Sequence, residues 1–407
     1  MTEATRRQLH LGAILEGVGA DHASWLDPDL PGDASIDIDW YIDNARAAEA
    51  AKFDLVFIVD SPYITPDTAP HFLNRLEPLT LLSAVAASTS HIGLVGTLTT
   101  SYWEPYNVAR QFGSLDQISR GRAGWNVVTT GLEGAARNYG REEHFDHKVR
   151  YACAREFVDV VQGLWDSYED DAFPRDREAG IFLDKGKQHR LDHKGAHFSV
   201  AGPLALSRSP QGQPVIFQAG DSNEGRNPDH VKILPGLVPI IAETDEEAQA
   251  ITAAAQETLD IGKLLVQVGR AFNYHDFSRY DLDAPFPDLS GSYKGHAERI
   301  IREAREKGLT LRDAAYRFGQ WRSDFVGSPE TIADQIERWF TGRAADGFLL
   351  RVTRPKDFAL FRERVVPILQ QRGLFRTDYT DRTLRGHLGL PVPENRHTRA
   401  LQAIAAE

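Results

Sequence analysis

Short apolar runs alternate with amphipathic helical patterns along much of this chain, and this alternation limits the possible folds more than any other feature. Phe53–Val59 is apolar apart from Asp54, which is typical of a strand covered on both faces. Helical spacing of apolar residues follows at Pro78–Thr89 and recurs at Tyr151–Trp165. Four such units before Trp165 favour a closed (β/α)8 barrel, an α/β fold, over an open sheet. Strands are predicted at 8–15, 53–59, 92–97, 123–128, 214–219, 231–241 and 346–352.

Two stretches break the alternation and are predicted to be insertions in a single barrel domain that spans residues 1–407. The insertion at about 167–213 is polar and poorly periodic, whereas the one at about 252–322 is mostly helical in pattern. The polar tail at 374–407 is predicted to wrap around the outside of the barrel.

Composition limits the classes of function. The chain has 407 residues, of which 42% are hydrophobic, and its net charge is -12, which argues against a general binder of nucleic acid or anionic membranes. Cys153 is the one cysteine, so no internal disulfide can form. The sequence contains neither a signal-peptide core nor an apolar run long enough to span a bilayer, and we therefore predict a cytoplasmic protein.

One helix is missing from the pattern. The strand-like runs at 214–219 and 231–241 are separated only by a short polar stretch, although full helices separate the other predicted strands. Seven strands are therefore predicted where a closed barrel needs eight.

Polar residues stand where several predicted strands end. Asp60 follows "FDLVFIV", Thr97 ends "HIGLVGT", Asn126 lies in "GRAGWNVVTT", and Ser222 follows "VIFQAGD". In a parallel barrel these carboxyl ends form the active face. Each residue could equally cap a turn, but four at equivalent places favour a binding site. No Gly-x-Gly-x-x-Gly or P-loop motif is present, which gives a Rossmann or P-loop interpretation little support.

A second cluster lies in "HFDHKVRYACAREF". His144 and His147 are three residues apart, and Tyr151 follows His147 by four, so all could share a helix face. Paired histidines raise the possibility of a metal, but no third ligand has a recognisable spacing. A His and a Tyr could instead bind a phosphate or the polar edge of a ring. The turn that ends at Ser222 could also hold an anion, with Asp221 beside it as an objection.

Long segments of the chain resemble a known family. They are "FDLVFIVDS", "LEPLTLLSAVAASTSHIGLVGTLTTSYWEPYNVARQFGSLDQISRGRAGWNVVTT", "ARNYG", "HKVRY", "RSPQGQPVIFQAG" and "VVPILQQRGLFRTDY". Together they resemble the nitrilotriacetate/dibenzothiophene-sulfone monooxygenase group of the bacterial luciferase-like superfamily, over nearly the whole chain.

The resemblance implies a (β/α)8 barrel with insertions that uses reduced FMN and O2. A separate NAD(P)H-dependent flavin reductase would supply the reduced FMN, and the chain would form a homodimer or homotetramer. The resemblance places FMN contacts at Asp60, Thr97, His147, Tyr151 and Ser222, with Asn126 near the flavin. His147 could also handle a proton, although binding is the simpler role. No other catalytic residue and no metal ligand is implied.

The chain departs from the family after residue 226. The family continues from this point through a strand and parts of two helices before "GRxPDHVKI", whereas "EGRNPDHVKI" joins the two ends directly here. Two explanations stay open: the sequence omits a segment of a longer polypeptide, or the chain has lost one βα unit. The first is favoured because a barrel without one strand keeps unpaired edges. A true loss would put flavin binding through Ser222 in doubt.

The leading hypothesis is a two-component, FMNH2-dependent monooxygenase that oxidises a small organic molecule. Members of the family cleave C–N, C–S or C–halogen bonds or hydroxylate alkanes, and the residues do not choose among these substrates. The main alternative is a non-catalytic flavin-binding barrel with a degenerate fold. A flavin-free hydrolase that uses Asp60 is a third possibility. An aminopolycarboxylate would need a cationic pocket, to which Arg75, Arg137 or Arg150 could contribute.

Overall fold

The computed structural model describes residues 7–66, 68–219, 230–257, 260–272, 275–289, 296–319, 323–352 and 354–400. The chain divides into two compact units, which we describe separately. The barrel unit comprises Met1–Val238 and Ala333–Glu407, and the helical unit comprises Pro239–Ile332. The single domain with insertions over residues 1–407 stays a prediction.

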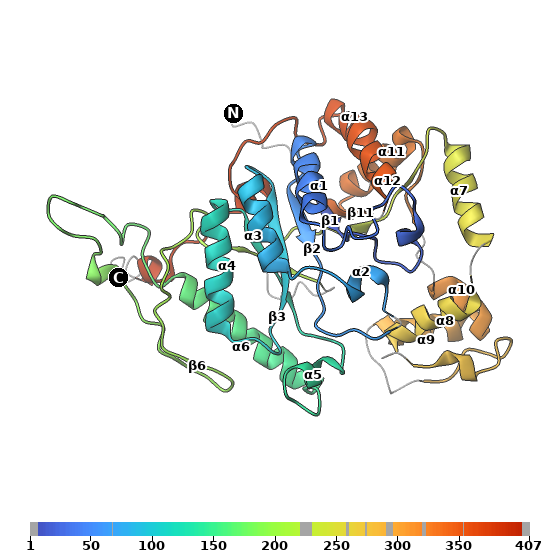
Figure 1. The fold of residues 1–407 in the computed structure, drawn as a ribbon, viewed down its shortest axis with the longest axis horizontal. Coiled ribbons are helices and arrows are strands. Elements are labelled where there is room, and N and C mark those ends of the chain that lie inside the picture. Colours follow the sequence, from blue (N-terminus) through green and yellow to red (C-terminus); the bar gives the residue numbers. More distant parts are fainter. Residues whose placement is uncertain are drawn as a thin grey trace. The chain divides into compact units, whose positions relative to one another are not determined.

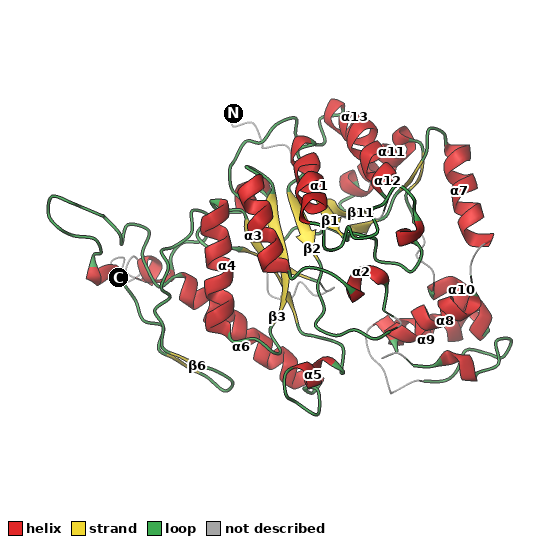
Figure 2. Ribbon diagram, in the orientation of Figure 1, coloured by secondary structure: helices red, strands yellow, loops and turns green. Residues whose placement is uncertain are grey.

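The barrel unit is built on a curled sheet of seven parallel strands in the order β7-β4-β3-β2-β1-β11-β8. The sheet confirms the predicted α/β architecture, with seven strands where a closed barrel has eight. Figure 2 shows β1, β2 and β3 of this sheet behind the helices that cover it. The strands are β1 (His10–Leu15), β2 (Leu55–Ile58), β3 (Gly93–Thr99), β4 (Ala123–Val128), β7 (Val215–Gln218), β8 (Gly236–Leu237) and β11 (Gly347–Val352).

Helices cover the outer face of the sheet. α3 (Pro78–Ser88) packs against β3, and α4 (Pro105–Ser119) packs against β4 and lies between α3 and α6 (His147–Trp165) (Figure 1). α3 begins with Pro78 in its first turn, and the Glu77 carboxylate accepts from two backbone N–H groups there. The other helical elements of this unit are η1 (Ser24–Leu26), α1 (Ile38–Ala50), α2 (Pro70–Leu73), α5 (Ala135–Asn138), η2 (Lys185–Lys187), α12 (Pro355–Leu360), η5 (Phe361–Val365), α13 (Val366–Gln371), α14 (Leu384–His387) and most of α11 (Pro329–Thr341).

The inner face of the sheet holds a core that includes part of the C-terminal tail. Leu384 and Leu388 are buried against Phe57 and Val95, which point to the same side of neighbouring strands. Gly93 and Gly124 make room for Leu384, because a Cβ atom at either position would lie within 3.1 Å of that side chain. The prediction that the tail wraps around the outside is therefore wrong for α14. Its leucines fill the interior because the strands there present glycines instead of large side chains.

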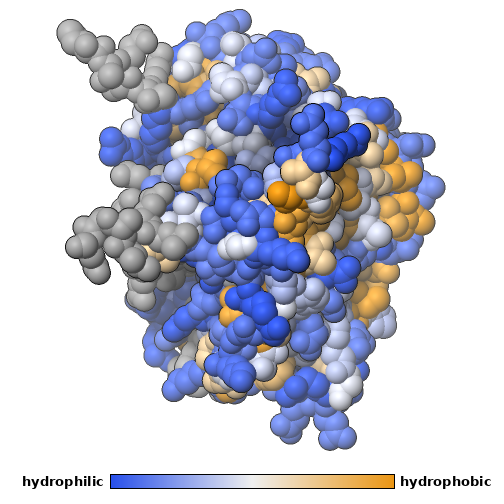
Figure 3. All heavy atoms as spheres, turned by 90° about the vertical axis from the view of Figure 1, so that its left-hand side faces the viewer, coloured by the Kyte–Doolittle hydropathy of each residue, from blue (hydrophilic) through white to orange (hydrophobic). Residues whose placement is uncertain are grey.

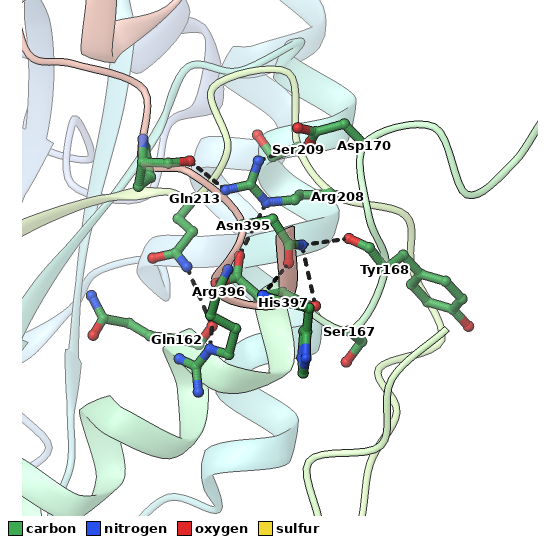
Figure 4. Close-up of polar contacts among 12 residues, drawn as sticks. Gln162, Ser167, Tyr168, Asp170, Arg208, Ser209, Gln213, Asn395, Arg396 and His397 are labelled. Atoms are coloured by element: carbon green, nitrogen blue, oxygen red, sulfur yellow. Dashed lines mark hydrogen bonds and ion pairs between the residues drawn. The ribbon is translucent and has the colours of Figure 1, made fainter. Parts of the chain in front are cut away.

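The insertion at about 167–213 is fastened to the end of α6 by residues from the tail. From the tail, the Asn395 amide donates to the carbonyl oxygen of Tyr168 at 2.8 Å (Figure 4). From the insertion itself, the Arg208 guanidinium pairs with Asp166, at the end of α6, at 3.0 Å. Within the insertion, β5 (His193–Lys194) and β6 (Ser199–Val200) form a short antiparallel pair. The polar composition of this segment thus supports a network of hydrogen bonds and ion pairs.

The helical unit has its own apolar core. Leu265, Val268, Phe272, Ile300 and Leu311 pack together in it. This confirms the mostly helical pattern predicted for 252–322. The described elements of the unit are β9 (Ile240–Ile241), α7 (Asp245–Glu257), α8 (Ile261–Ala271), η4 (Phe277–Arg279), α9 (His296–Lys307), α10 (Leu311–Phe318) and β10 (Val326–Gly327), together with the start of α11.

The sheet is open where the sequence lacks a unit. β7 and β8 lie at its two ends, and no strand pairing joins them in the described part of the chain. The prediction of one strand over 231–241 is wrong. β8 ends at Leu237, and β9 pairs with β10 in the helical unit. Pro239 stands between β8 and β9, and its missing N–H group interrupts a continuous ladder.

Candidate active site

A cavity of about 470 Å³ opens where β2, β3 and β4 end. This volume lies within the range of roughly 300–1,000 Å³ that is usual for small-molecule sites. Its walls combine apolar and aromatic side chains with an almost equal share of polar and charged ones. The lining residues are Asp60, Ser61, Pro62, Phe72, Leu73, Arg75, Leu76, Glu77, Thr97, Leu98, Thr99, Trp103, Val128, Asn138 and Tyr139.

Asp60 holds Arg75 at one wall of this cavity. The guanidinium Nε and Nη2 atoms both donate to Asp60 Oδ1, at 2.8 and 2.5 Å. Arg75 also donates to the carbonyl oxygens of Ser61 and Phe72, at 2.6 and 2.8 Å. The arginine charge is thus neutralised, and most of its donors are already used. Arg75 is therefore poorly placed to act as the carboxylate receptor that the sequence suggested.

Thr97 and Asn126 are brought into direct contact. Asn126 Nδ2 donates to Thr97 Oγ1 at 3.0 Å, and Thr97 Oγ1 donates to the carbonyl oxygen of Ile58 at 2.8 Å. Both side chains are buried, with 6% and 3% of their surface exposed. They lie opposite each other in the β3–β4 register, so the strand pairing itself creates this contact.

Aromatic rings form another part of the site. Tyr139 lines the cavity and stacks on Tyr102, with ring centres 4.5 Å apart and planes 3° apart. The Tyr102 hydroxyl is hydrogen-bonded to His144 Nδ1, and His144 Nε2 lies 2.8 Å from the Thr130 carbonyl oxygen. A carbonyl only accepts, so Nε2 carries the proton and Nδ1 accepts from the tyrosine. Burial is the main cause that lowers the pKa of His144, and the nearby Arg150 charge lowers it further. Both effects favour the neutral ring.

The first turns of α6 lie beside the end of β4. The Arg150 guanidinium donates to the carbonyl oxygens of Thr129 and Thr130, which follow that strand directly. Tyr151 is the next residue and is 48% exposed. His147 is the first residue of α6, but its side chain lies outside the description. The predicted proximity of Tyr151 and His147 to the flavin remains a prediction.

Ser222 and the Asp221 turn lie outside the described residues, so the predicted anion site there is not placed. Residues on either side of it line a second cavity of about 880 Å³, which lies between the open ends of the sheet. Its lining comprises Phe57, Asn126, Val158, Gln162, Gln213, Pro214, Val215, Ile216, Phe217, Gln218, Ala219, His230, Val231, Lys232, Ile233, Leu234, Pro235, Leu349, Arg385, Leu388, Leu390 and Pro393.

Comparison with known proteins agrees with this geometry. Residues 22–224 match the family of luciferase-like monooxygenases. The chain is 42% identical to the N-acetyl-S-(2-succino)cysteine monooxygenase of Bacillus subtilis, and the match covers 97% of this chain and 99% of that protein. The chain belongs to the luciferase-like monooxygenase family. It is thus a flavin-dependent monooxygenase by family, as the sequence motifs predicted.

Other relatives of this monooxygenase cover nearly all of it. It is 38% identical to nitrilotriacetate monooxygenase component A of Aminobacter aminovorans, over 96% of this chain and 98% of that protein. A structure of riboflavin lyase with modified FMN and riboflavin superposes with a TM-score of 0.83 at 31% identity, covering 96% of this chain and 98% of that one. A long-chain alkane monooxygenase structure superposes with a TM-score of 0.80 at 30% identity, covering 96% of each chain.

The alignment with the Bacillus subtilis relative also bears on the open sheet. It runs over 443 positions, although this chain has only 407 residues, so the relative contains residues that have no counterpart here. The comparison therefore agrees with a segment missing from this sequence, and both explanations, an omitted segment and a true loss, stay open.

The sequence did not single out Trp103 and Tyr139 as site residues. Both lie in segments that carried the family resemblance, "SYWEPY" and "ARNYG", but neither stands at the end of a strand. Tyr139 reaches the cavity from the turn after α5. An aromatic residue in a loop gives no periodic signal, so the resemblance was the one indication available.

Proposed function

We propose that this monooxygenase is the oxygenase component of a two-component system. It takes reduced FMN from a separate NAD(P)H:flavin reductase and uses O2 to oxidise a small organic molecule. The observation that carries the proposal is the cavity at the strand ends, where Asp60 and Thr97 lie among aromatic walls in a chain of this family. The printed name of the Aminobacter relative, component A, also indicates a system with more than one protein.

The residues present fit a flavin ring. An isoalloxazine is flat and has one polar edge, and the cavity offers Trp103 and Tyr139 as flat walls with Thr97 as a polar group. We assign Asp60, Thr97, Asn126, His147, Tyr151 and Ser222 to flavin binding. Ser222, with His147 and Tyr151, would hold the phosphate end.

The flavin, when bound, supplies the reaction with O2, and the protein orients the ring and keeps water out. Asp60 acts through Arg75, because their ion pair ties the loop after β2 to the segment after α2 and keeps this wall in place. Asn126 acts through Thr97, whose hydroxyl it orients. His144, neutral and held at both ring nitrogens, fixes the stacked tyrosines.

The substrate is proposed only by class. The relatives named above act on a thioether-type cysteine adduct, an aminopolycarboxylate and an alkane, as their names state. The neutralised Arg75 gives the described cavity no free cationic group, which favours a substrate whose reacting part is uncharged. Carboxylates elsewhere on the molecule are compatible with this proposal.

The test is reconstitution. Purified protein is mixed with a flavin reductase, NADH, FMN and air, and is offered N-acetyl-S-(2-succino)cysteine, nitrilotriacetate, dibenzothiophene sulfone, a long-chain alkane and a halogenated phenol. Loss of one compound that depends on the protein, reductase and O2 supports the proposal. If reduced FMN leaves the protein spectrum unchanged under anaerobic conditions, the proposal fails.

One observation favours a second candidate. The open sheet between β7 and β8 suits a non-catalytic flavin-binding barrel, because a site that cannot exclude water loses its reactive oxygen species. In the same assay this candidate predicts flavin binding and NADH consumption without loss of any substrate.

A homodimer or homotetramer is also proposed. On the face shown in Figure 3, hydrophobic residues gather in several areas among hydrophilic ones. Ile181 and Phe182 of the insertion are 48% and 67% exposed, and a second copy could cover side chains of this kind. Light scattering on the purified protein tests the assembly, and a monomeric mass would contradict it.

In the described part of the chain, none of the helices is both long enough and apolar enough for a membrane span.

A further inference from the structure

Tyr139 presents a hydrogen-bond donor to the cavity of about 470 Å³. Its hydroxyl oxygen accepts from the indole N–H of Trp103, because an indole nitrogen can only donate. The hydroxyl hydrogen of Tyr139 therefore points away from Trp103. Among the residues that the structure describes, none accepts from this hydroxyl. The hydrogen is thus left for a ligand in the cavity.

The Tyr139 phenol keeps this hydrogen at neutral pH. Burial is the main cause that raises the pKa of Tyr139, and the nearby Asp60 charge raises it further. The hydrogen bond from Trp103 acts in the opposite direction, but the pKa stays above its ordinary value. The ring is held in place by Tyr102, which stacks on one of its faces at 4.5 Å between centres. The donor is therefore fixed in both position and charge state.

Other donors in the cavity wall have partners inside the protein. Thr97 and the side-chain amide of Asn138 donate to backbone carbonyl oxygens, each at 2.8 Å. Arg75 donates to Asp60 and to two further carbonyl oxygens. Tyr139 differs from these three residues, because its hydrogen has no partner within the described part of the chain.

Tyr139 lies at the rim of the cavity, whereas Thr97 lies at its floor. Tyr139 is 38% exposed, and Thr97, in the last turns of β3, is 3% exposed. The flavin is proposed to lie against the strand ends, which form this floor. The organic substrate then has to approach the flavin from the exposed side, where the Tyr139 hydroxyl stands.

We infer that Tyr139 is a specificity-determining residue whose hydroxyl donates to an oxygen atom of the substrate. The inference rests on the proposed function, because it needs flavin on the floor of this cavity. It narrows the substrate to small molecules with an accepting oxygen, such as that of a carboxylate, an amide or a sulfone, and it sets alkanes aside. A hydrocarbon in the same place would cover the O–H group and leave it unpaired, which disfavours binding.

The experiment measures the binding of test compounds to the full-length protein by anaerobic equilibrium dialysis with reduced FMN, so that no turnover occurs. N-acetyl-S-(2-succino)cysteine, nitrilotriacetate and dibenzothiophene sulfone carry accepting oxygens, whereas dibenzothiophene and hexadecane contain no oxygen. Wild type should bind at least one compound of the first group. Tyr139→Phe keeps the ring and removes the hydroxyl, so it should weaken that binding about tenfold. Affinity for the oxygen-free compounds should stay the same or rise.

Tyr106→Phe is the matched control. Tyr106 lies in α4, its hydroxyl donates to the Pro203 carbonyl oxygen at 3.4 Å, and it does not line the cavity. This variant should leave the binding of every compound unchanged. Affinity for reduced FMN, measured by anaerobic titration, should be equal in wild type and both variants, which also shows that the variants are folded.

Several results overturn the inference and leave flavin binding in place. One is that reduced FMN binds but no oxygen-bearing compound does. Another is that Tyr139→Phe weakens neither group of compounds, weakens both alike, or acts no differently from Tyr106→Phe. A loss of FMN affinity in Tyr139→Phe as large as the loss of compound binding would place the hydroxyl against the flavin instead. If wild type does not bind reduced FMN at all, the proposed function fails and the inference fails with it.

Discussion

The middle and the ends of the curled sheet differ in how completely their strands are paired. β3 has neighbours on both sides, and all seven of its residues are buried. β7 has one neighbour, and its burial falls from Val215 to the exposed Gln218, while β8 contains only two residues. We call β3 and its neighbours β2 and β4 the complete half, and the end strands β7 and β8 the incomplete half. The Thr97–Asn126 contact lies in the complete half, and Ser222 follows β7 of the incomplete half in the sequence. The ring end of the proposed flavin site therefore lies in the fully paired part of the sheet, and its proposed phosphate end lies beside the unpaired strands.

The largest effect is expected from supplying a strand between β7 and β8. The variant carries, between Arg226 and Asn227, the segment of the Bacillus subtilis relative that has no counterpart in this chain. Because the new strand would pair with β7 and β8 and cover the 880 Å³ cavity, we expect the free energy of unfolding to rise by more than about 4 kcal/mol. Urea unfolding followed by circular dichroism measures it.

A Gly/Ser linker of equal length at the same place is the control for this insertion. It lengthens the loop without supplying a strand and should lower stability slightly. Equal stability of the two insertions would show that the open ends of the sheet carry no deficit. The intact mass of the natural polypeptide separately decides between an omitted segment and a true loss.

The leucines of the tail allow the two halves to be compared directly. Leu384 is fully buried between the complete strands, so Leu384→Ala should cost about 3 kcal/mol of unfolding free energy. Leu390 is only partly buried and lines the open cavity, so Leu390→Ala should cost less than about 1 kcal/mol. Urea unfolding of both variants tests the difference. Equal costs would mean that the open side is packed as well as the closed side.

The fold was predictable where local patterns agree with tertiary structure. The runs at 53–59 and 123–128 are apolar because helices cover them, and both are strands in the sheet. The break at Pro239 was missed because β8 and β9 are too short to show a period of two. The burial of Leu384 was missed because Leu384, Leu388 and Leu390 stand in a polar segment without a clear period. Leu384 finds its place only where the glycines of β3 and β4 make room for it.

The site was predictable in part. Strand-end positions pointed to Asp60 and Thr97, which line the cavity, and to Asn126, which contacts Thr97, because the carboxyl ends of parallel strands meet at one face. Their role in flavin binding stays a prediction. The ion pair of Asp60 with Arg75 and the hydrogen-bond direction at Thr97 could not be predicted, since they depend on which side chains face each other across loops. The phosphate end remains a prediction from resemblance.

Two variants compare the halves through their affinity for reduced FMN. Tyr151→Phe, beside the complete half, and Ser222→Ala, beside the incomplete half, should each weaken binding of reduced FMN about tenfold or more without unfolding the protein. A hydrogen bond to a charged phosphate contributes roughly 1.5–3 kcal/mol, and Tyr151 is exposed enough to tolerate the change. Anaerobic titration measures the affinity. A loss in Tyr151→Phe alone would show that the gap has already disabled the turn at Ser222, and unchanged affinity in both would remove the phosphate assignment.

The smallest effect concerns a buried acid in the complete half. Asp116 of α4 accepts from the Ala123 N–H group at the start of β4, and burial raises its pKa to about 6. The unfolded carboxyl has a pKa of about 3.9, so the folded state binds more protons between these values, and ionisation of Asp116 makes stability fall as pH rises through this window. Asp116→Asn mimics the protonated acid and does not titrate. Between pH 4.5 and 6, the fall in the free energy of unfolding should therefore be about 1–2 kcal/mol smaller in Asp116→Asn than in wild type. Urea unfolding at both pH values measures it, with the exposed Asp159→Asn as the matched control. The same pH dependence in Asp116→Asn and wild type would contradict this prediction, because it would mean that Asp116 is ionised throughout the window. The complete half would then contain a buried charge instead of a buried neutral acid.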